Sequence, residues 1–492
     1  MSGIRQQAIS GLKWTTLSQV SRIGTQLLSV LILARLLPPA DYGLIAMATT
    51  VTGFAGLFRD FGTAAALIQK DDPSPRLLDS VFWLNVAFGV LLALLLGLLA
   101  PLIAYGFAEP KLKEVLWGLL LTFPIASLAA VHQALLEKSS CFRPLAIIET
   151  VTAFIGFVGA VCAAWAGWGV YSLVLQTLLV VFLTTVCLWF ASQWRPAFRW
   201  ETNEIKSVMN FSRNLVGFNM VNYFIRNADN MLIGRFLGAS ELGIYAMAYR
   251  LMLWPLQNIS SVVGRVLFPT FCRLQGDQNR IAGAYVQVTA TIMLISAPLM
   301  FGFFILRVPF IAVVLGEHWK PMTDILVWLV PLGLLQSIGT SVGSLYLATG
   351  RTDVMFKWGV GAGLLVIPAF VIGLQWGITG VAASYAIASL LLFYPGLAIP
   401  FRWVGLRVGD VLLKLIPSIA TAAMMAGVIQ LMANAWDTNM TSQWLPLNSF
   451  NINNEVLRLS LLVIVGIITY GGLSLITQRK LLNDIIHAVF NR

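Results

Sequence analysis

The chain contains few of the residues that build redox, metal or disulfide chemistry. Its 492 residues include four cysteines and three histidines. The cysteines lie far apart without a C-x-x-C pair, and the histidines are equally scattered. Because a zinc site or a disulfide framework needs such side chains at short, regular spacing, the sequence predicts neither, and no metal or cofactor is expected.

Charged residues are also scarce, at 11% of the chain, while hydrophobic residues make up 58% and the mean hydropathy is +0.81. A soluble globule needs a more polar surface, so this composition is typical of a chain embedded in lipid. The longest polar connection, residues 434–455, is too short for a folded catalytic domain, and its only acids are Asp437 and Glu455. No catalytic residues are predicted, and the sequence does not indicate an enzyme.

Apolar windows of spanning length follow one another along the chain. A helix needs about 20 mostly apolar residues to cross a hydrocarbon layer of about 30 Å. About fourteen such windows predict an all-α integral membrane protein with about fourteen transmembrane helices. The windows begin near Gly11, Tyr42, Leu78, Leu112, Pro144, Gly169, Ser207, Leu242, Ile281, Pro321, Val354, Ile378, Val411 and Leu457.

Lysine and arginine are distributed unevenly between the predicted loops. They concentrate on the N-terminal side and in alternate loops, whereas the intervening loops hold few. By the positive-inside rule, this asymmetry places both termini in the cytoplasm. The net charge of +11 therefore reflects membrane topology, and no nucleic-acid partner is expected. Trp168, Trp319, Trp376 and Trp436 fall near the outer interface, where we expect them to form an aromatic belt, with stacking on a sugar as the alternative.

One segment of the chain occurs twice. Residues 33–48, LARLLPPADYGLIAMA, recur as residues 233–248, IGRFLGASELGIYAMA, with six identities in sixteen positions and an acid at both Asp41 and Glu241. Each copy joins two long apolar stretches, which predicts two lobes of about six helices related by a parallel repeat, an architecture of alternating-access transporters. We expect an N-terminal lobe at residues 1–200, a second lobe at 201–405, and an appended transmembrane helix pair with a cytoplasmic tail at 406–492.

Polar residues occur at helical spacing in the first, second, seventh and eighth windows, which are repeat-related pairs. Steps of three or four place them on one face of each helix. Because a charge inside a membrane costs about 2.5 to 3.5 kcal/mol on insertion scales, we expect these faces to line a water-filled cavity. Guanidinium groups form paired hydrogen bonds with phosphate, so an arginine-rich cavity suits an anionic cargo. The predicted substrate-binding residues are Arg22, Arg59, Arg226, Arg250, Arg265, Asn219 and Asn222.

Three acids, Asp60, Glu149 and Asp229, are candidates for ion coupling. A cycle driven by H⁺ or Na⁺ needs a carboxylate that binds the ion, and the spacing does not distinguish the two ions. Other interpretations remain open for individual residues. In one such interpretation, Arg226 and Asp229 form a structural ion pair, because they are three positions apart on one helix. In another interpretation, the side chain of Arg265, which lies near a cytoplasmic helix end, extends to the membrane–water interface.

Several strings resemble those of one family, the bacterial oligosaccharide flippases. These are the lipopolysaccharide and exopolysaccharide exporters, in particular of the colanic-acid-exporter type, of the multidrug/oligosaccharidyl-lipid/polysaccharide exporter superfamily. The resemblance runs over about residues 5–405. It is carried by FRDFGTAAALIQK at 58–70, VFWLNV at 81–86, RVLFPTFCRLQGD at 265–277, LGEHW at 315–319 and LATGRTDVMFK at 347–357.

The resemblance implies a flippase of the bacterial inner membrane that moves undecaprenyl-pyrophosphate-linked oligosaccharide repeat units from the cytoplasmic to the periplasmic leaflet. Its implied partners are this lipid-linked substrate, membrane lipids and the polysaccharide polymerase machinery. By helix and depth, the resemblance also implies that Arg22, Arg59 and Arg250 contact the pyrophosphate region. The sugar composition, the coupling ion, the oligomeric state and the role of the last two helices stay open.

Three other functions compete with this interpretation. A cation-coupled multidrug antiporter of the same superfamily would favour an acidic or aromatic cavity, which the excess of arginine opposes. A membrane glycan polymerase or glycosyltransferase would act on the same lipid-linked substrate, but it usually exposes a larger loop with carboxylates or paired arginines. A scaffold without transport activity would not need inward-facing polar stripes.

Overall fold

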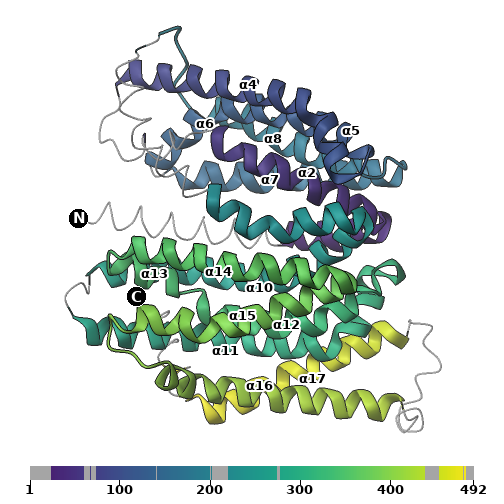
Figure 1. Cartoon of the computed structure of the whole chain (residues 1–492), viewed down its shortest axis with the longest axis vertical. Helices are drawn as coiled ribbons and strands as arrows, with labels where there is room; N and C mark the ends of the chain where they lie inside the picture. The colour runs from purple at the N-terminus through teal and green to yellow at the C-terminus, as the bar shows by residue number, and fades with distance from the viewer. Residues whose placement is uncertain are drawn as a thin grey trace. The chain divides into compact units, whose positions relative to one another are not determined.

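The computed structural model of the chain describes residues 24–59, 67, 74–139, 141–199, 201, 220–273, 277–437, 454–479, 481 and 483. Throughout these residues all regular structure is helical (Figure 1), which confirms the predicted all-α class. Each predicted apolar window contains at least part of a described helix.

Nine stretches of described helix are long and apolar enough to cross a membrane. One of them, Thr352–Phe401, contains two of the predicted windows. The windows near Gly11, Tyr42, Ser207 and Leu242 fall outside the nine, and these are the first, second, seventh and eighth, which carry the polar stripes. The windows near Gly11 and Ser207 are described only in part, and the nine apolar stretches make the chain a multi-pass membrane protein.

The helices form two compact units, residues 1–246 and 247–492. The lobe boundaries expected near residues 200 and 405 stay predictions. The first unit contains two helical segments without a label in Figure 1, Gly24–Leu36 and residues 220–236. Its labelled helices are α2 (Pro39–Arg59), α4 (Pro75–Phe107), α5 (Lys111–Leu120), α6 (Thr122–Lys138), α7 (Phe142–Trp165) and α8 (Tyr171–Ala191).

The change of unit falls inside α10 (Gly238–Arg273). In the second unit, α11 (Gln278–Phe310) is followed by a π-helical turn, Ile311–Leu315, and by a 3₁₀ turn, Glu317–Trp319. A second 3₁₀ turn, Leu374–Trp376, follows α14 (Thr352–Gly373). The other helices of this unit are α12 (Met322–Gly339), α13 (Val342–Ala348), α15 (Gly377–Phe401), α16 (Val408–Asp437) and α17 (Asn454–Thr477).

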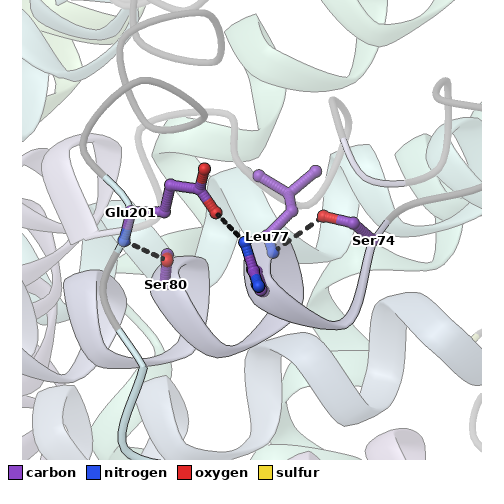
Figure 2. A network of polar contacts seen from close by, with 5 residues as sticks. Ser74, Leu77, Ser80 and Glu201 are labelled. Carbon is purple, nitrogen blue, oxygen red and sulfur yellow. Dashed lines mark hydrogen bonds and ion pairs between the residues drawn. The ribbon is translucent and has the colours of Figure 1, made fainter.

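Short-range sequence signals fix the start of α4. The backbone N–H of Leu77 donates to Ser74 Oγ at 3.1 Å, which satisfies one of the unpaired donors of the first turn (Figure 2). Pro75 follows the cap, where its lack of an N–H costs nothing. The sequence itself thus supplies the cap at which α4 begins.

The two copies of the repeated segment meet inside the first unit. Gly43 in α2 and Gly243 in α10 occupy the same position of the repeat. A Cβ atom on Gly43 would overlap the carbonyl oxygen of Ala239, and a Cβ atom on Gly243 would overlap that of Pro39. Pro39 and Ala239 are also equivalent in the repeat, so the contact is symmetric. Glycine at both positions lets the two backbones approach closely.

The last two helices are built into the second unit. Both α16 and α17 pack against α11, where Leu306, Met425, Ile429 and Leu462 are buried together. The hydroxyl of Tyr470 in α17 donates to the carbonyl oxygen of Leu294 in α11 at 2.7 Å. The predicted appended pair therefore shares a core with α11.

One of the predicted belt tryptophans lies elsewhere. Trp319 is fully buried in the second unit, whereas Trp168 and Trp376 are exposed. The expectation of an interfacial anchor was wrong for Trp319, because the 3₁₀ turn that holds it, Glu317–Trp319, turns its ring into the core rather than outward.

Candidate functional site

The structure describes only part of the predicted site. Arg22, Asn219 and Asp60 lie outside the described residues, and so does the side chain of Arg265, whose backbone is in α10. Their predicted roles stay predictions. The described candidates are Arg59, Arg226, Arg250, Asn222, Glu149 and Asp229.

These described candidates differ in exposure. Arg226 and Asn222 are exposed on the helical segment 220–236, and Arg250 is exposed on α10. Glu149 is exposed on α7, and its predicted part in ion coupling is untested. Arg59, the last residue of α2, is half-buried, and Asp229 is 5% exposed. Arg59 and Asp229 are therefore the least exposed of the described candidates.

Asp229 is held by two donors. The hydroxyl of Tyr245 in α10 donates to Asp229 Oδ2 at 3.1 Å, and the backbone N–H of Asn230 donates to Oδ1 at 2.8 Å. Arg226, three residues earlier, forms no ion pair with Asp229 in this described part of the chain. The interpretation of Arg226 and Asp229 as a structural pair was therefore wrong, since Asp229 turns to a buried tyrosine in the next helix.

The polar helices of the two repeats contact each other within the first unit. Phe54 of α2 packs on Phe224 with ring centroids 4.8 Å apart. The hydroxyl of Tyr223 donates to the carbonyl oxygen of Thr50 at 2.8 Å. The predicted second and seventh helices thus lie side by side, as the stripes suggested, and the full cavity expected among four helices remains a prediction.

A cavity of about 410 Å³ lies beside Arg59 in the first unit. We call it the α6 cavity, because α6 supplies most of its lining. Arg59 comes from α2 and Thr184 and Thr185 from α8. The polar residues of α6 here are Gln133 and Glu137, and Gln133 Nε2 donates to Glu137 Oε1 at 2.8 Å. This cavity places a permanent cation and a carboxylate around one space.

Sequence reasoning missed the polar residues of α6 and α8. The fourth and sixth windows are apolar enough to span a membrane, so their few polar residues do not form a stripe. The signal that was available is the i, i+4 spacing of Gln133 and Glu137, which places both on one helix face. The spacing does not reveal that these residues line the same cavity as Arg59, because that arrangement depends on how the helices pack.

A second polar network ties the segment after α8 to α4. Asp79 is 2% exposed, and its Oδ1 accepts the backbone N–H of Ala197 at 3.0 Å. Ser80 Oγ accepts the backbone N–H of Glu201 at 2.9 Å, as Figure 2 shows. The indole of Trp83 donates to the carbonyl oxygen of Ala197 at 3.0 Å. These bonds fix the chain where it leaves α8.

Asp79→Ala is expected to loosen this segment. It leaves the part-buried N–H of Ala197 without its acceptor, which costs about 1 kcal/mol. We expect a lower melting temperature and faster proteolysis between residues 192 and 201. Asp410→Ala, at an exposed position in the first turn of α16, is the control and should change neither. Equal melting and proteolysis for the two variants would contradict this role of Asp79.

Together these features define a class of protein. The chain is an all-α multi-pass membrane protein in which an arginine and a glutamate border one cavity, an arrangement typical of a transporter. Comparison with known proteins gives the family. The chain belongs to the family described as "Polysaccharide biosynthesis protein", which it matches over residues 32–324.

Relatives extend this match along the chain. It is 31% identical to the teichuronic acid biosynthesis protein TuaB of Bacillus subtilis, over 82% of this chain and 83% of TuaB. It is 27% identical to the succinoglycan biosynthesis transport protein ExoT of Rhizobium meliloti, over 96% of this chain and 94% of ExoT. The match to ExoT therefore reaches beyond the span of residues 5–405 that the sequence strings covered.

A solved structure confirms the fold. The lipid II flippase MurJ, in an inward closed conformation, superposes with a TM-score of 0.73 over 96% of this chain and all of MurJ. The two sequences are 16% identical, so this likeness concerns the fold alone. The predicted family and fold class are thus confirmed.

Proposed function

We propose that this protein is a flippase that moves undecaprenyl-pyrophosphate-linked oligosaccharide repeat units from the cytoplasmic to the periplasmic leaflet by alternating access, for the synthesis of a surface polysaccharide. Family membership supports the polysaccharide part of the proposal. Relatives named for polysaccharide biosynthesis or transport support it as well. The substrate part rests on the chemistry of the polar helices.

The observation that carries the substrate is the position of Arg59. This guanidinium, at the end of the polar helix α2, borders a cavity within a membrane protein. Guanidinium stays protonated at all physiological pH values and binds phosphate oxygens in pairs. A pyrophosphate carried on a lipid matches such a group, whereas a cationic drug would be repelled by it.

The proposal includes an orientation and a site in the cell. We place the protein in the bacterial inner membrane with both termini in the cytoplasm, because lysine and arginine concentrate in the loops on that side. Arg59 ends α2 on the cytoplasmic side in this orientation, where the substrate is loaded. The polysaccharide polymerase machinery would receive the product on the opposite side.

Ion coupling is the part of the proposal that concerns Asp229. We propose that H⁺ or Na⁺ binds to a carboxylate during the cycle, and Asp229 is the candidate that the protein encloses. Transport is measured in vesicles with a pH gradient at equal Na⁺ and in vesicles with a Na⁺ gradient at equal pH, which separates the two ions. If neither gradient changes the rate, the protein works without coupling.

Deleting the gene in its own host tests the function. We expect polysaccharide output to stop and lipid-linked repeat units to accumulate on the cytoplasmic leaflet, where a membrane-impermeant oxidant of sugars does not reach them in intact spheroplasts. Mass spectrometry of extracted lipids measures the pool. Accumulation on the periplasmic leaflet would indicate a polymerase instead, and an unchanged pool with greater sensitivity to cationic drugs would indicate an antiporter.

A further inference from the structure

The α6 cavity is open because four of the six α6 residues that line it are alanines. Ala126, Ala129, Ala130 and Ala134 recur along the helix at steps of one to four and line the cavity. Alanine ends at Cβ, so this face leaves a space where larger residues would fill it. The volume of about 410 Å³ lies within the range of about 300 to 1,000 Å³ that small-molecule sites occupy.

The polar groups around this space come from three helices, α2, α6 and α8. Arg59 contributes positive charge from α2. Gln133 and Glu137, joined by their 2.8 Å hydrogen bond, contribute a side-chain amide and a carboxylate from α6. Thr184 adds a hydroxyl from α8, 3.0 Å from the hydroxyl of Thr152. All of these groups belong to one compact unit.

The bond between Gln133 and Glu137 leaves acceptors and a donor for a ligand. It uses one N–H of the Gln133 amide and one oxygen of the Glu137 carboxylate. Among the described residues, no other protein group bonds to Gln133 Oε1, to its second N–H or to Glu137 Oε2. An amide beside a carboxylate both donates and accepts, as a sugar with several hydroxyl groups requires.

Charge decides which part of a ligand each wall accepts. The carboxylate of Glu137 repels phosphate oxygens and accepts hydroxyl protons, whereas Arg59 attracts phosphate. The two walls therefore suit a molecule that joins a phosphate to an uncharged sugar. A purely anionic ligand would gain nothing from Glu137, and a purely neutral one would gain little from Arg59.

We propose that the α6 cavity binds the first sugar of the lipid-linked oligosaccharide, with Gln133 and Glu137 holding its hydroxyl groups and Arg59 holding the adjoining pyrophosphate. This inference rests on the proposed function and adds a sugar-recognition site to it. Gln133 and Glu137 are then specificity-determining residues, and the identity of the first sugar matters more for transport than that of later ones.

Two lipids separate sugar recognition from pyrophosphate recognition. The full chain in lipid nanodiscs is titrated with undecaprenyl pyrophosphate carrying one sugar, and with undecaprenyl pyrophosphate alone. We expect Gln133→Ala and Glu137→Gln to weaken binding of the glycosylated lipid by about tenfold, the loss of one hydrogen bond to a charged or polar group. Gln133→Ala should bind the sugar-free lipid as the wild type does, and Glu137→Gln should bind it no more weakly, because this change removes a charge that repels phosphate. Arg59→Ala should weaken binding of both lipids.

A filled cavity and a matched control complete the design. Ala130→Leu fills the space without removing a polar group, and we expect it to weaken binding of the glycosylated lipid alone. Gln430→Ala is the control, because Gln430 is an exposed glutamine of α16 bonded to Asn434 at 2.9 Å, the same i, i+4 arrangement outside the cavity. It should bind both lipids normally.

The outcomes distinguish this inference from the proposed function. Wild-type binding of both lipids with no selective loss in Gln133→Ala, Glu137→Gln and Ala130→Leu would overturn the sugar site and leave the flippase intact. Failure of the wild type to bind either lipid would overturn both. Equal weakening for the two lipids would place Gln133 and Glu137 in a structural role only, which also contradicts the inference.

Discussion

Gly43→Ala is expected to prevent most of the protein from accumulating in a folded form, and Gly243→Ala is expected to do the same. A single added methyl group would overlap a backbone carbonyl oxygen in each case, that of Ala239 or that of Pro39. A flexible side chain could rotate away from such a clash, but a carbonyl oxygen moves only with its helix. The cost should therefore exceed the about 1 to 3 kcal/mol typical of overpacking in a core.

Gly56→Ala is the matched control for this effect. Gly56 lies on α2, as Gly43 does, and a Cβ atom there meets nothing within 4 Å. Because alanine favours helix by about 1 kcal/mol over glycine, Gly56→Ala should be neutral or stabilising. Membrane level and melting temperature of the detergent-solubilised protein measure all three variants. If Gly43→Ala matched Gly56→Ala, the two helices would not cross as closely as described.

Arg59→Ala is expected to abolish transport while leaving the amount of protein in the membrane normal. A guanidinium bound to pyrophosphate through two charge-assisted hydrogen bonds contributes about 1.5 to 3 kcal/mol for each. Losing both should slow transport at low substrate concentration by about a hundredfold or more. Arg59→Lys keeps the charge but not the paired geometry, so it should retain part of the rate.

A structural role of Arg59 would have a different outcome. Arg59 lies in the last turn of α2, where a cation stabilises the helix dipole by about 0.3 to 1 kcal/mol. That is too little to unfold a protein, so reduced transport with normal membrane levels would point to the substrate. Arg280→Ala, which removes an exposed ion pair with Asp277, is the control and should transport normally. Loss of Arg59→Ala from the membrane would contradict the binding role.

Hydropathy and polar spacing predicted the fold and the polar helices because both depend on local composition. The lipid solvent selects spanning segments by their average apolarity, and ten of the predicted windows correspond to the nine apolar stretches of described helix. The repeat likewise showed that Gly43 and Gly243 are equivalent. It did not show that they touch, because equivalence in a repeat carries no information on packing.

The candidate site was harder to predict, since its partners are distant in the sequence. Arg59 was found from its depth in a polar stripe, but Glu137 lies on a later helix, α6, and joins it only in the folded unit. The spacing predicted an ion pair between Asp229 and Arg226, whereas in the structure the buried Asp229 accepts a hydrogen bond from the hydroxyl of Tyr245. Contacts between helices are set by packing, and a periodicity within one helix does not identify them.

The most direct test of the flippase is reconstitution of the purified chain into liposomes with an undecaprenyl-pyrophosphate oligosaccharide in the inner leaflet. An external glycosidase measures how fast the sugar appears outside. The proposal predicts protein-dependent exposure that is lost in Arg59→Ala and kept in Arg280→Ala. Exposure no faster than in protein-free liposomes, together with efflux of a cationic drug from the same vesicles, would contradict it and indicate a multidrug antiporter.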